Sequence, residues 1–68
     1  MKNGEDARMR MSVRVKVGKL KGAVGTIVDI DGENDEWLTV EIQGVFNGEV
    51  IDVKQQYHED SLEIVDHG

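Results

Sequence analysis

A short basic loop is the first feature of this sequence with the chemistry to bind a partner. Lys16, Lys19 and Lys21 lie close together in the sequence, with Gly18 and Gly22 among them. Lysine ammonium groups bind phosphate, and glycine turns can present backbone N–H groups to the same ligand. The alternative is that the lysines only keep the end of a strand in water, and the residues alone leave this open. The candidate contact residues are Arg14, Lys16, Lys19, Lys21 and Gly22.

A second candidate surface is acidic and lies in residues 29–37. Its members are Asp29, Asp31, Glu33, Asp35, Glu36 and Trp37. The carboxylates invite comparison with a calcium loop, but neither Asp29 nor Asp31 as first ligand puts glycine at position 6 and glutamate at position 12. We therefore expect no metal here. The segment is a solvated hairpin tip or, alternatively, a face that engages a basic partner or imitates a nucleic acid.

No catalytic constellation is evident. The chain has no cysteine, and its two histidines, His58 and His67, lie in a polar stretch and near the end of the sequence. Ser61 follows an acidic pair, where a turn or capping role is typical. Lys21-Gly22 lacks the glycine and the Ser/Thr that a P-loop requires around it. We expect neither an enzyme nor a cofactor, metal or small-molecule substrate.

Charge is distributed unevenly along the 68 residues. The net charge is −6, yet seven of the eight basic residues and only two of the fourteen acidic ones lie in residues 1–21. That segment carries +5 and the remainder −11, which predicts a polarised surface. The lack of cysteine suits a reducing compartment, and neither a secretory signal nor a membrane-length apolar run is evident. We expect a cytoplasmic acidic protein with no membrane partner.

Short strands with glycine turns dominate the pattern. Valines alternate with basic residues over 11–17, apolar residues of both parities over 23–30 indicate a covered or bulged strand, and 36–43 alternates cleanly. Further strands are expected at 49–53 and 62–65, with a connection over 44–48 and a 3₁₀ turn over 57–60. Five strands predict an all-β fold, a small five-stranded barrel over 11–66, with a flexible N-terminal leader over 1–10 and a tail at 67–68. The predicted core is Val13, Val15, Val17, Val24, Ile27, Ile30, Leu38, Val40, Ile42, Ile51, Leu62 and Ile64.

One spacing carries a family resemblance. The pattern Val15-x-x-Gly18-x-x-Lys21-Gly22-x-x-Gly25-x-Ile27-x-x-Ile30 resembles the KOW motif of NusG-type elongation factors and of a large-subunit ribosomal protein. The ending over residues 59–65 is similar to the helical turn and last strand of such SH3-like barrels, so that the likeness covers about residues 11–65. It implies an SH3-like barrel that docks onto a nucleoprotein complex, with RNA, DNA or a protein as partner. It also implies contacts through Lys19, Lys21 and Gly22.

Aromatic residues bear on the type of ligand. Trp37, Phe46 and Tyr57 are the only three, and the sequence does not reveal their exposure. Because single-strand recognition relies on base stacking against aromatic rings, their scarcity favours backbone or protein contact over base recognition.

Overall fold

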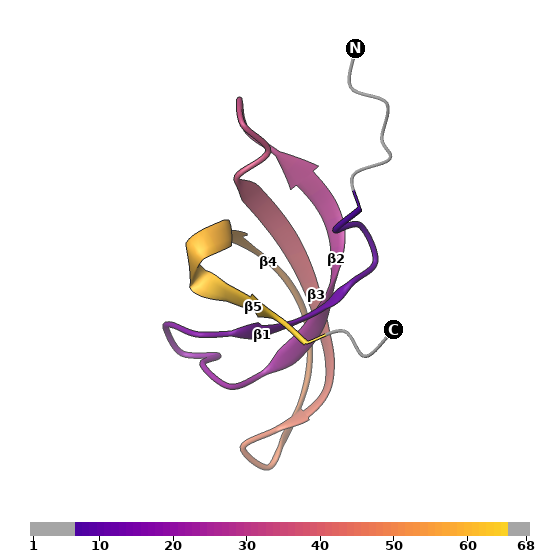
Figure 1. The fold of residues 1–68 in the computed structure, drawn as a ribbon. Helices are drawn as coiled ribbons and strands as arrows, with labels where there is room; N and C mark the ends of the chain where they lie inside the picture. The colour runs from indigo at the N-terminus through magenta and orange to yellow at the C-terminus, as the bar shows by residue number, and fades with distance from the viewer. Residues whose placement is uncertain (1–6, 66–68) are drawn as a thin grey trace.

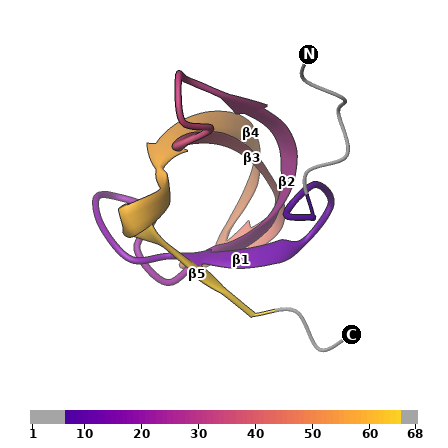
Figure 2. The ribbon, with the colours of Figure 1, turned by 45° about the horizontal axis from the view of Figure 1, so that its top comes forward.

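Five antiparallel strands and one 3₁₀ turn make up the computed structural model, which describes residues 7–65 (Figure 1). They are β1 (Ser12–Val15), β2 (Val24–Asp31), β3 (Trp37–Phe46), β4 (Glu49–His58), η1 (Glu59–Ser61) and β5 (Leu62–Ile64). The strands form one sheet in the order β4-β3-β2-β1-β5. Figure 2 shows the sheet curled into a ring, but among the described residues no pairing joins β4 to β5. The all-β class and the five strands are confirmed, and the curled sheet, open between β4 and β5, has a small SH3-like fold.

The core is formed by side chains on the concave face of the curled sheet. Ile27 and Ile30 are three residues apart, a spacing that would put them on opposite faces of a regular strand. Both point inward because a bulge between Ile27 and Asp29 shifts the register of β2 against β3. The bulge explains why apolar residues of both parities occur in this strand. The buried residues are Val13, Val15, Ala23, Ile27, Ile30, Leu38, Val40, Ile42 and Leu62.

Three residues of the predicted core are exposed instead. Val17 lies beyond the end of β1, and Val24 stands opposite Arg14 on the outer face. Ile64 pairs with Val13 but lies in the edge strand β5, where β1 covers only one side of it. Each prediction was wrong because strand ends and sheet edges are set by pairing, which a local pattern does not contain. Ile51 is half-buried and packs against the core, whereas Ala23 is a core residue that the pattern missed.

The β3–β4 hairpin is longer than predicted. Its register runs from Trp37 opposite His58 to Phe46 opposite Glu49, so the connection is only Asn47-Gly48 and not residues 44–48. The polar residues 54–58 belong to β4 because the backbone ladder with β3 holds them. The 3₁₀ turn consequently starts at Glu59, later than predicted, and His58 Nδ1 caps it by accepting a hydrogen bond from the Asp60 amide at 3.1 Å.

The hairpin turn gives a first stability prediction. Asn47 and Gly48 have φ values of 53° and 82°, and a two-residue type I′ turn requires positive φ at both positions. A methyl group on Gly48 would meet no atom within 4 Å, so Gly48→Ala tests backbone conformation alone. We expect it to lower the free energy of unfolding by about 1–2 kcal/mol, measured by denaturant titration. Asn47→Gly is the control and should leave stability nearly unchanged. An unaltered Gly48→Ala midpoint would contradict the turn assignment.

The described chain begins with a turn that is attached to the sheet. Residues 7–10 belong to the predicted leader, yet the Arg10 amide donates to the Ile27 carbonyl at 2.8 Å and Met9 packs against the core. The rest of the leader, residues 1–6, and the predicted end of the domain and tail, residues 66–68, lie outside the described residues. The domain limits themselves stay a prediction. None of the described residues belongs to a helix of the length and apolarity needed to cross a membrane.

Candidate partner-binding surfaces

The basic loop, residues 16–22, connects β1 to β2 and is held firmly at its base. The Gly22 amide donates to the Val15 carbonyl at 2.8 Å, and the Val15 amide donates to the Ala23 carbonyl at 2.9 Å. On the other side, the Lys16 amide donates to the Ser61 carbonyl at 2.8 Å. Leu20 packs against the core from within the loop. The loop therefore presents its side chains from a fixed backbone.

The two glycines of the basic loop allow the backbone turns that form it. Gly18 and Gly22 have φ values of 79° and 95°, in the left-handed region that favours glycine. Turn hydrogen bonds join the Lys21 amide to the Gly18 carbonyl and the Ala23 amide to the Leu20 carbonyl. The expectation that the Gly22 amide would donate to a phosphate is wrong, because that N–H is already bonded to Val15. The Gly22 amide is therefore excluded as a phosphate donor, and the lysine side chains are the charged groups that the loop offers.

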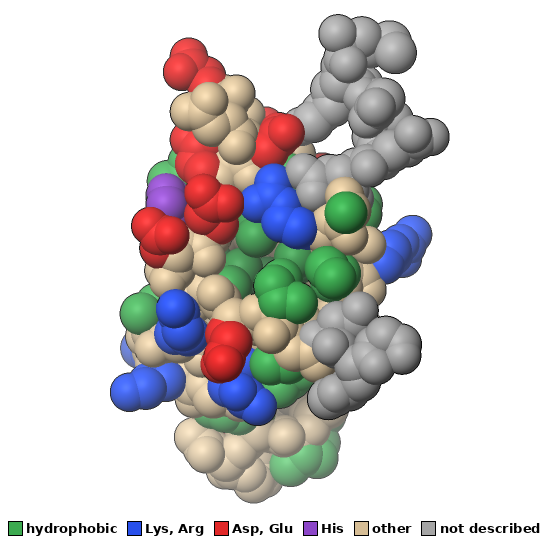
Figure 3. Space-filling model, in the orientation of Figure 1, with side chains coloured by type: hydrophobic (Ala, Val, Ile, Leu, Met, Phe, Trp, Pro, Cys, Tyr) green, Lys and Arg blue, Asp and Glu red, His purple; other side chains and the backbone are tan. Residues whose placement is uncertain are grey.

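Those lysines are exposed and carry uncompensated charge. Among residues 7–65, no acidic side chain forms an ion pair with Lys16, Lys19 or Lys21. Arg14 differs, because its guanidinium lies 3.1 Å from the Glu63 carboxylate across the β1–β5 pair. Figure 3 shows basic side chains gathered over this part of the molecule, below the acidic ones. The structure thus groups three of the four predicted basic side chains as an unpaired set and leaves Arg14 partly neutralised.

The acidic end, defined as residues 31–36 together with Glu59 and Asp60, brings two distant segments side by side. The Glu59 amide donates to the Glu36 carbonyl at 2.8 Å. Arg8 bridges both segments, since Nη1 lies 3.0 Å from Glu59 Oε1 and Nη2 donates to the Asp35 carbonyl at 2.8 Å. Acidic side chains consequently crowd the upper part of Figure 3. Sequence reasoning missed Glu59 and Asp60, whose place here is set by the strand pairing of β4.

Several predicted acidic residues have local roles within this end. Asp31 Oδ1 accepts from the Gly32 amide at 2.9 Å, and Glu36 Oε1 accepts from the Asn34 amide at 2.9 Å. Asp29 lies in β2, just before the acidic end, and its Oδ1 accepts a hydrogen bond from the Ile30 amide at 3.0 Å. Glu33, at the tip of the turn, is exposed. Among the described residues, no group of three His, Cys, Asp or Glu side chains is arranged to hold a metal ion.

Arg8 connects the two segments of the acidic end, so its replacement should lower the stability of the protein measurably. Arg8→Ala removes two charge-assisted hydrogen bonds made by a side chain that is 26% exposed. We expect a loss of about 1–2 kcal/mol in the free energy of unfolding, measured by denaturant titration. Arg10→Ala, a neighbouring exposed arginine, is the control. Equal effects of the two changes would show that the bridge contributes nothing specific.

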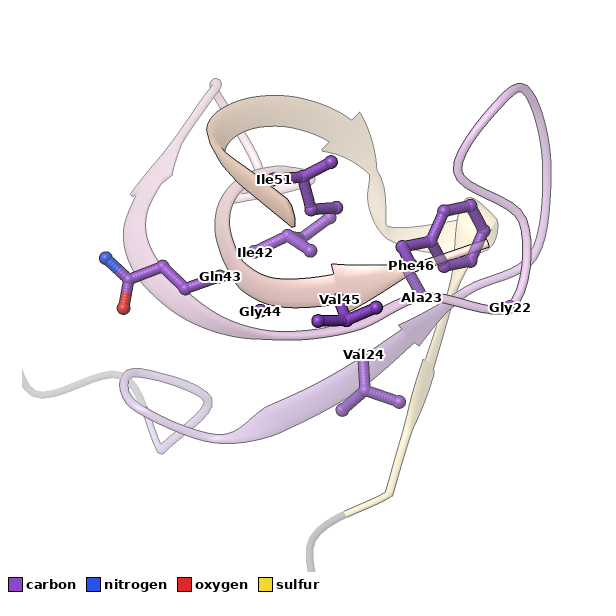
Figure 4. A pocket seen from close by; sticks show the side chains of 9 residues that line it. All are labelled: Gly22, Ala23, Val24, Ile42, Gln43, Gly44, Val45, Phe46 and Ile51. Carbon is purple, nitrogen blue, oxygen red and sulfur yellow. The ribbon is translucent and has the colours of Figure 1, made fainter. Parts of the chain in front are cut away.

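The aromatic residues occupy different surroundings. Trp37 is 41% exposed, and its ring meets the His58 ring in a T-shaped arrangement with 5.2 Å between centroids, beside Asp31 and Gln56. Tyr57 is half-buried, and burial raises the pKa of its hydroxyl. Phe46 is also half-buried and lines a shallow hollow between the base of the basic loop and the β3–β4 hairpin (Figure 4). The exposed tryptophan therefore lies at the acidic end and not beside the lysines.

Comparison with known proteins identifies the part of the chain that contains the basic loop. Residues 12–43 match the family model described as the KOW motif, which spans β1, the basic loop, β2 and most of β3. No curated protein and no solved structure matches the chain. KOW motifs occur in nucleic-acid- and ribosome-associated proteins, where they are in general non-catalytic binding modules. Residues 12–43 therefore match a KOW motif, and they lie within a small SH3-like fold.

Proposed function

We propose that this protein is a non-enzymatic module that docks onto a nucleoprotein complex of the transcription or translation machinery by placing its basic loop against the phosphate backbone of RNA or DNA. The observation that supports this most is the set of three exposed lysines, unpaired within the described residues, on a loop whose backbone is already fixed by hydrogen bonds. A fixed loop loses little conformational entropy on binding, so each lysine–phosphate contact retains most of its free energy. The KOW motif in the same residues points in the same direction.

Contacts of this kind would be made to phosphates and not to bases. Lysine acts as a point charge, and phosphate contacts position a protein without reading sequence. The exposed aromatic ring, Trp37, lies at the acidic end, so base stacking at the loop has no exposed ring to use among the described residues. We therefore expect weak binding with little sequence preference. The acidic end would point away from the nucleic acid, because its carboxylates repel phosphates.

A binding assay on the purified protein tests the proposal. Fluorescently labelled single-stranded RNA, single-stranded DNA and duplex DNA are titrated at low and at moderate salt. Salt-sensitive binding to at least one of them is the expected result, because lysine–phosphate contacts release counterions. Lack of binding to all three at low salt would reject the proposed function.

The acidic end supports a second candidate function, in which the protein engages a basic protein partner or imitates a nucleic acid. The observation in its favour is the convergence of two segments, residues 31–36 and η1, next to the exposed Trp37. An exposed indole beside carboxylates suits a lysine or arginine side chain, since the ring face attracts cations. Binding to a basic peptide that Glu33→Lys and Asp60→Lys abolish, and that Lys19→Glu leaves intact, would favour this function over the first.

A further inference from the structure

The long edge strand of the sheet is the feature that neither function uses. β4 has ten residues and pairs with β3 on one side only, because it stands first in the strand order β4-β3-β2-β1-β5. Within the described residues, the backbone ladder of β4 runs to β3 and to no other strand. An unpaired edge of this length is a template for another strand, and natural proteins usually protect it with proline, bulges, charged side chains or a covering segment. The sequence contains no proline, and β4 pairs with β3 in unbroken register.

The side chains of β4 show that its middle is open to solvent. Val53 and Gln55 lie on the concave face, opposite Ile42 and Val40 of β3. Ile42 and Val40 are buried, whereas Val53 and Gln55 are exposed. No described segment therefore covers this stretch of the strand. The other edge, β5, has three residues and is too short to offer a comparable ladder.

We propose that β4 is a self-association edge, along which β4 of a second copy adds in antiparallel orientation with Val53 opposite Val53. In this register Asp52 of each copy stands opposite Lys54 of the other. The two-fold axis thus creates two opposite-charge pairs on the convex face, where cross-strand neighbours interact directly. Nine residues of each strand, 49–57, pair in this register.

The charges select this register over its neighbours. In a symmetric antiparallel pair, each side chain stays on the same face of the sheet as in the monomer. The alternative registers therefore place the two-fold axis at another residue of β4, and never between two residues. A shift to Asp52 puts two aspartates opposite each other, and a shift to Lys54 puts two lysines opposite each other. Both place like charges in direct opposition, which destabilises a strand pair. The Val53-centred register is the one of these three with complementary charges, and it also brings two exposed valines together on the concave face.

Self-association along one strand should be weak and concentration-dependent. A single strand pair buries less surface than the usual stable interface, and each copy carries a net charge of −6 that opposes approach. Added salt should therefore screen the overall repulsion more than the close pairs and favour the dimer. This dependence is opposite to the one expected for nucleic-acid binding by the basic loop.

Sedimentation equilibrium of the full chain, from about 10 μM to about 1 mM, tests the proposal. We expect a monomer–dimer equilibrium in this range for the wild type. Asp52→Lys alone and Lys54→Asp alone should each raise the dimer dissociation constant about 10-fold or more, since each turns both attractive pairs into repulsive ones. The double variant Asp52→Lys/Lys54→Asp restores opposite charges and should restore the wild-type constant. Asp29→Lys is the control, because it changes the net charge by the same amount as Asp52→Lys but lies on β2; by lowering the overall repulsion it should strengthen association slightly and not weaken it.

Circular dichroism of each variant confirms that the monomer is folded, so that loss of association is not loss of structure. A wild type that is monomeric up to about 1 mM would overturn the proposal. A dimer that survives the single charge reversals would overturn it as well, because the register would then be a different one. If the single changes weakened association only by disturbing the fold of the monomer, the double variant would not restore the wild-type dissociation constant.

Discussion

Replacing Gly25 by alanine is expected to destabilise this protein more than any other single methyl addition in the sheet. A Cβ at this buried position would lie 2.5 Å from the Glu41 carbonyl oxygen and 2.7 Å from methylene and methyl carbons of Ile42 and Val40. The φ of Gly25 is not in the left-handed region, so the requirement for glycine is one of space. Since β2 pairs with β3 at Thr26 and Glu41, the obstructing backbone cannot move away without breaking the ladder.

The expected loss is large compared with the total stability of the domain. Overpacking of a core typically costs about 1–3 kcal/mol, and an obstructing backbone atom puts Gly25→Ala at the upper end of that range. A chain of 68 residues has a free energy of unfolding of roughly 3–10 kcal/mol. Gly25→Val, with two more methyl groups, should therefore leave most of the protein unfolded at room temperature. Denaturant titration followed by circular dichroism measures both changes.

Val24→Ala is the matched control for this prediction. Val24 precedes Gly25 on the same strand but points outward and is 48% exposed, so its truncation should cost well under about 1 kcal/mol. A Gly25→Ala variant as stable as the wild type would show that β2 and β3 are farther apart than the structure has them. In this chain the requirement for glycine at position 25 thus comes from the close approach of β3.

Reversing the charge of Lys19 and Lys21 should remove most of the binding to nucleic acid. For three lysine–phosphate contacts to a single strand, the logarithm of the binding constant is expected to fall with the logarithm of salt concentration with a slope of about −2. Each of the changes Lys19→Glu and Lys21→Glu removes one contact and adds repulsion, so we expect at least about a 10-fold loss of affinity at low salt for each. The double variant should show no measurable binding. Fluorescence anisotropy with the best of the three ligands gives these constants.

Lys54→Glu is the control with the same change of net charge. Lys54 lies on β4, outside the basic loop, and an effect as large as that of Lys19→Glu would mean that overall charge, and not the loop, governs binding. Arg14→Gln should have a smaller effect than the loop variants, because Arg14 already pairs with Glu63 at 3.1 Å. Unchanged affinity in the Lys19 and Lys21 variants would remove the basic loop from the interface.

The parts of the fold that sequence predicts here are those encoded by local spacing. Alternating valines located β1, glycines and lysines located the basic loop, and apolar residues on both parities of β2 pointed to a bulge that the register with β3 confirms. Residue types also indicated a turn in the region of Asn47-Gly48, although the predicted connection over 44–48 was longer than the two residues observed. These features depend on a few neighbouring residues.

The parts that sequence did not predict depend on contacts between distant residues. β4 extends through polar residues to His58 only because β3 lies beside it, and no alternation within 54–58 reveals this. The Gly22 amide is occupied because the chain returns to Val15, and Glu59 joins the acidic end because its amide meets Glu36. Ala23 is buried because residues around it cover it, and its small side chain gives no sign of this in the sequence pattern. Of the candidate site, the lysines followed from spacing, whereas the composition of the acidic end required the fold.

If the lysines of the basic loop contact phosphates, binding must weaken as salt is added, and it must weaken less steeply when Lys19 and Lys21 are neutral. The binding constant for single-stranded RNA is measured at several salt concentrations for the wild type and for the conservative variant Lys19→Gln/Lys21→Gln. We predict a wild-type slope of about −2 that falls to about −0.7 when only Lys16 remains. A slope that is the same in both proteins, or binding that does not respond to salt, would contradict it.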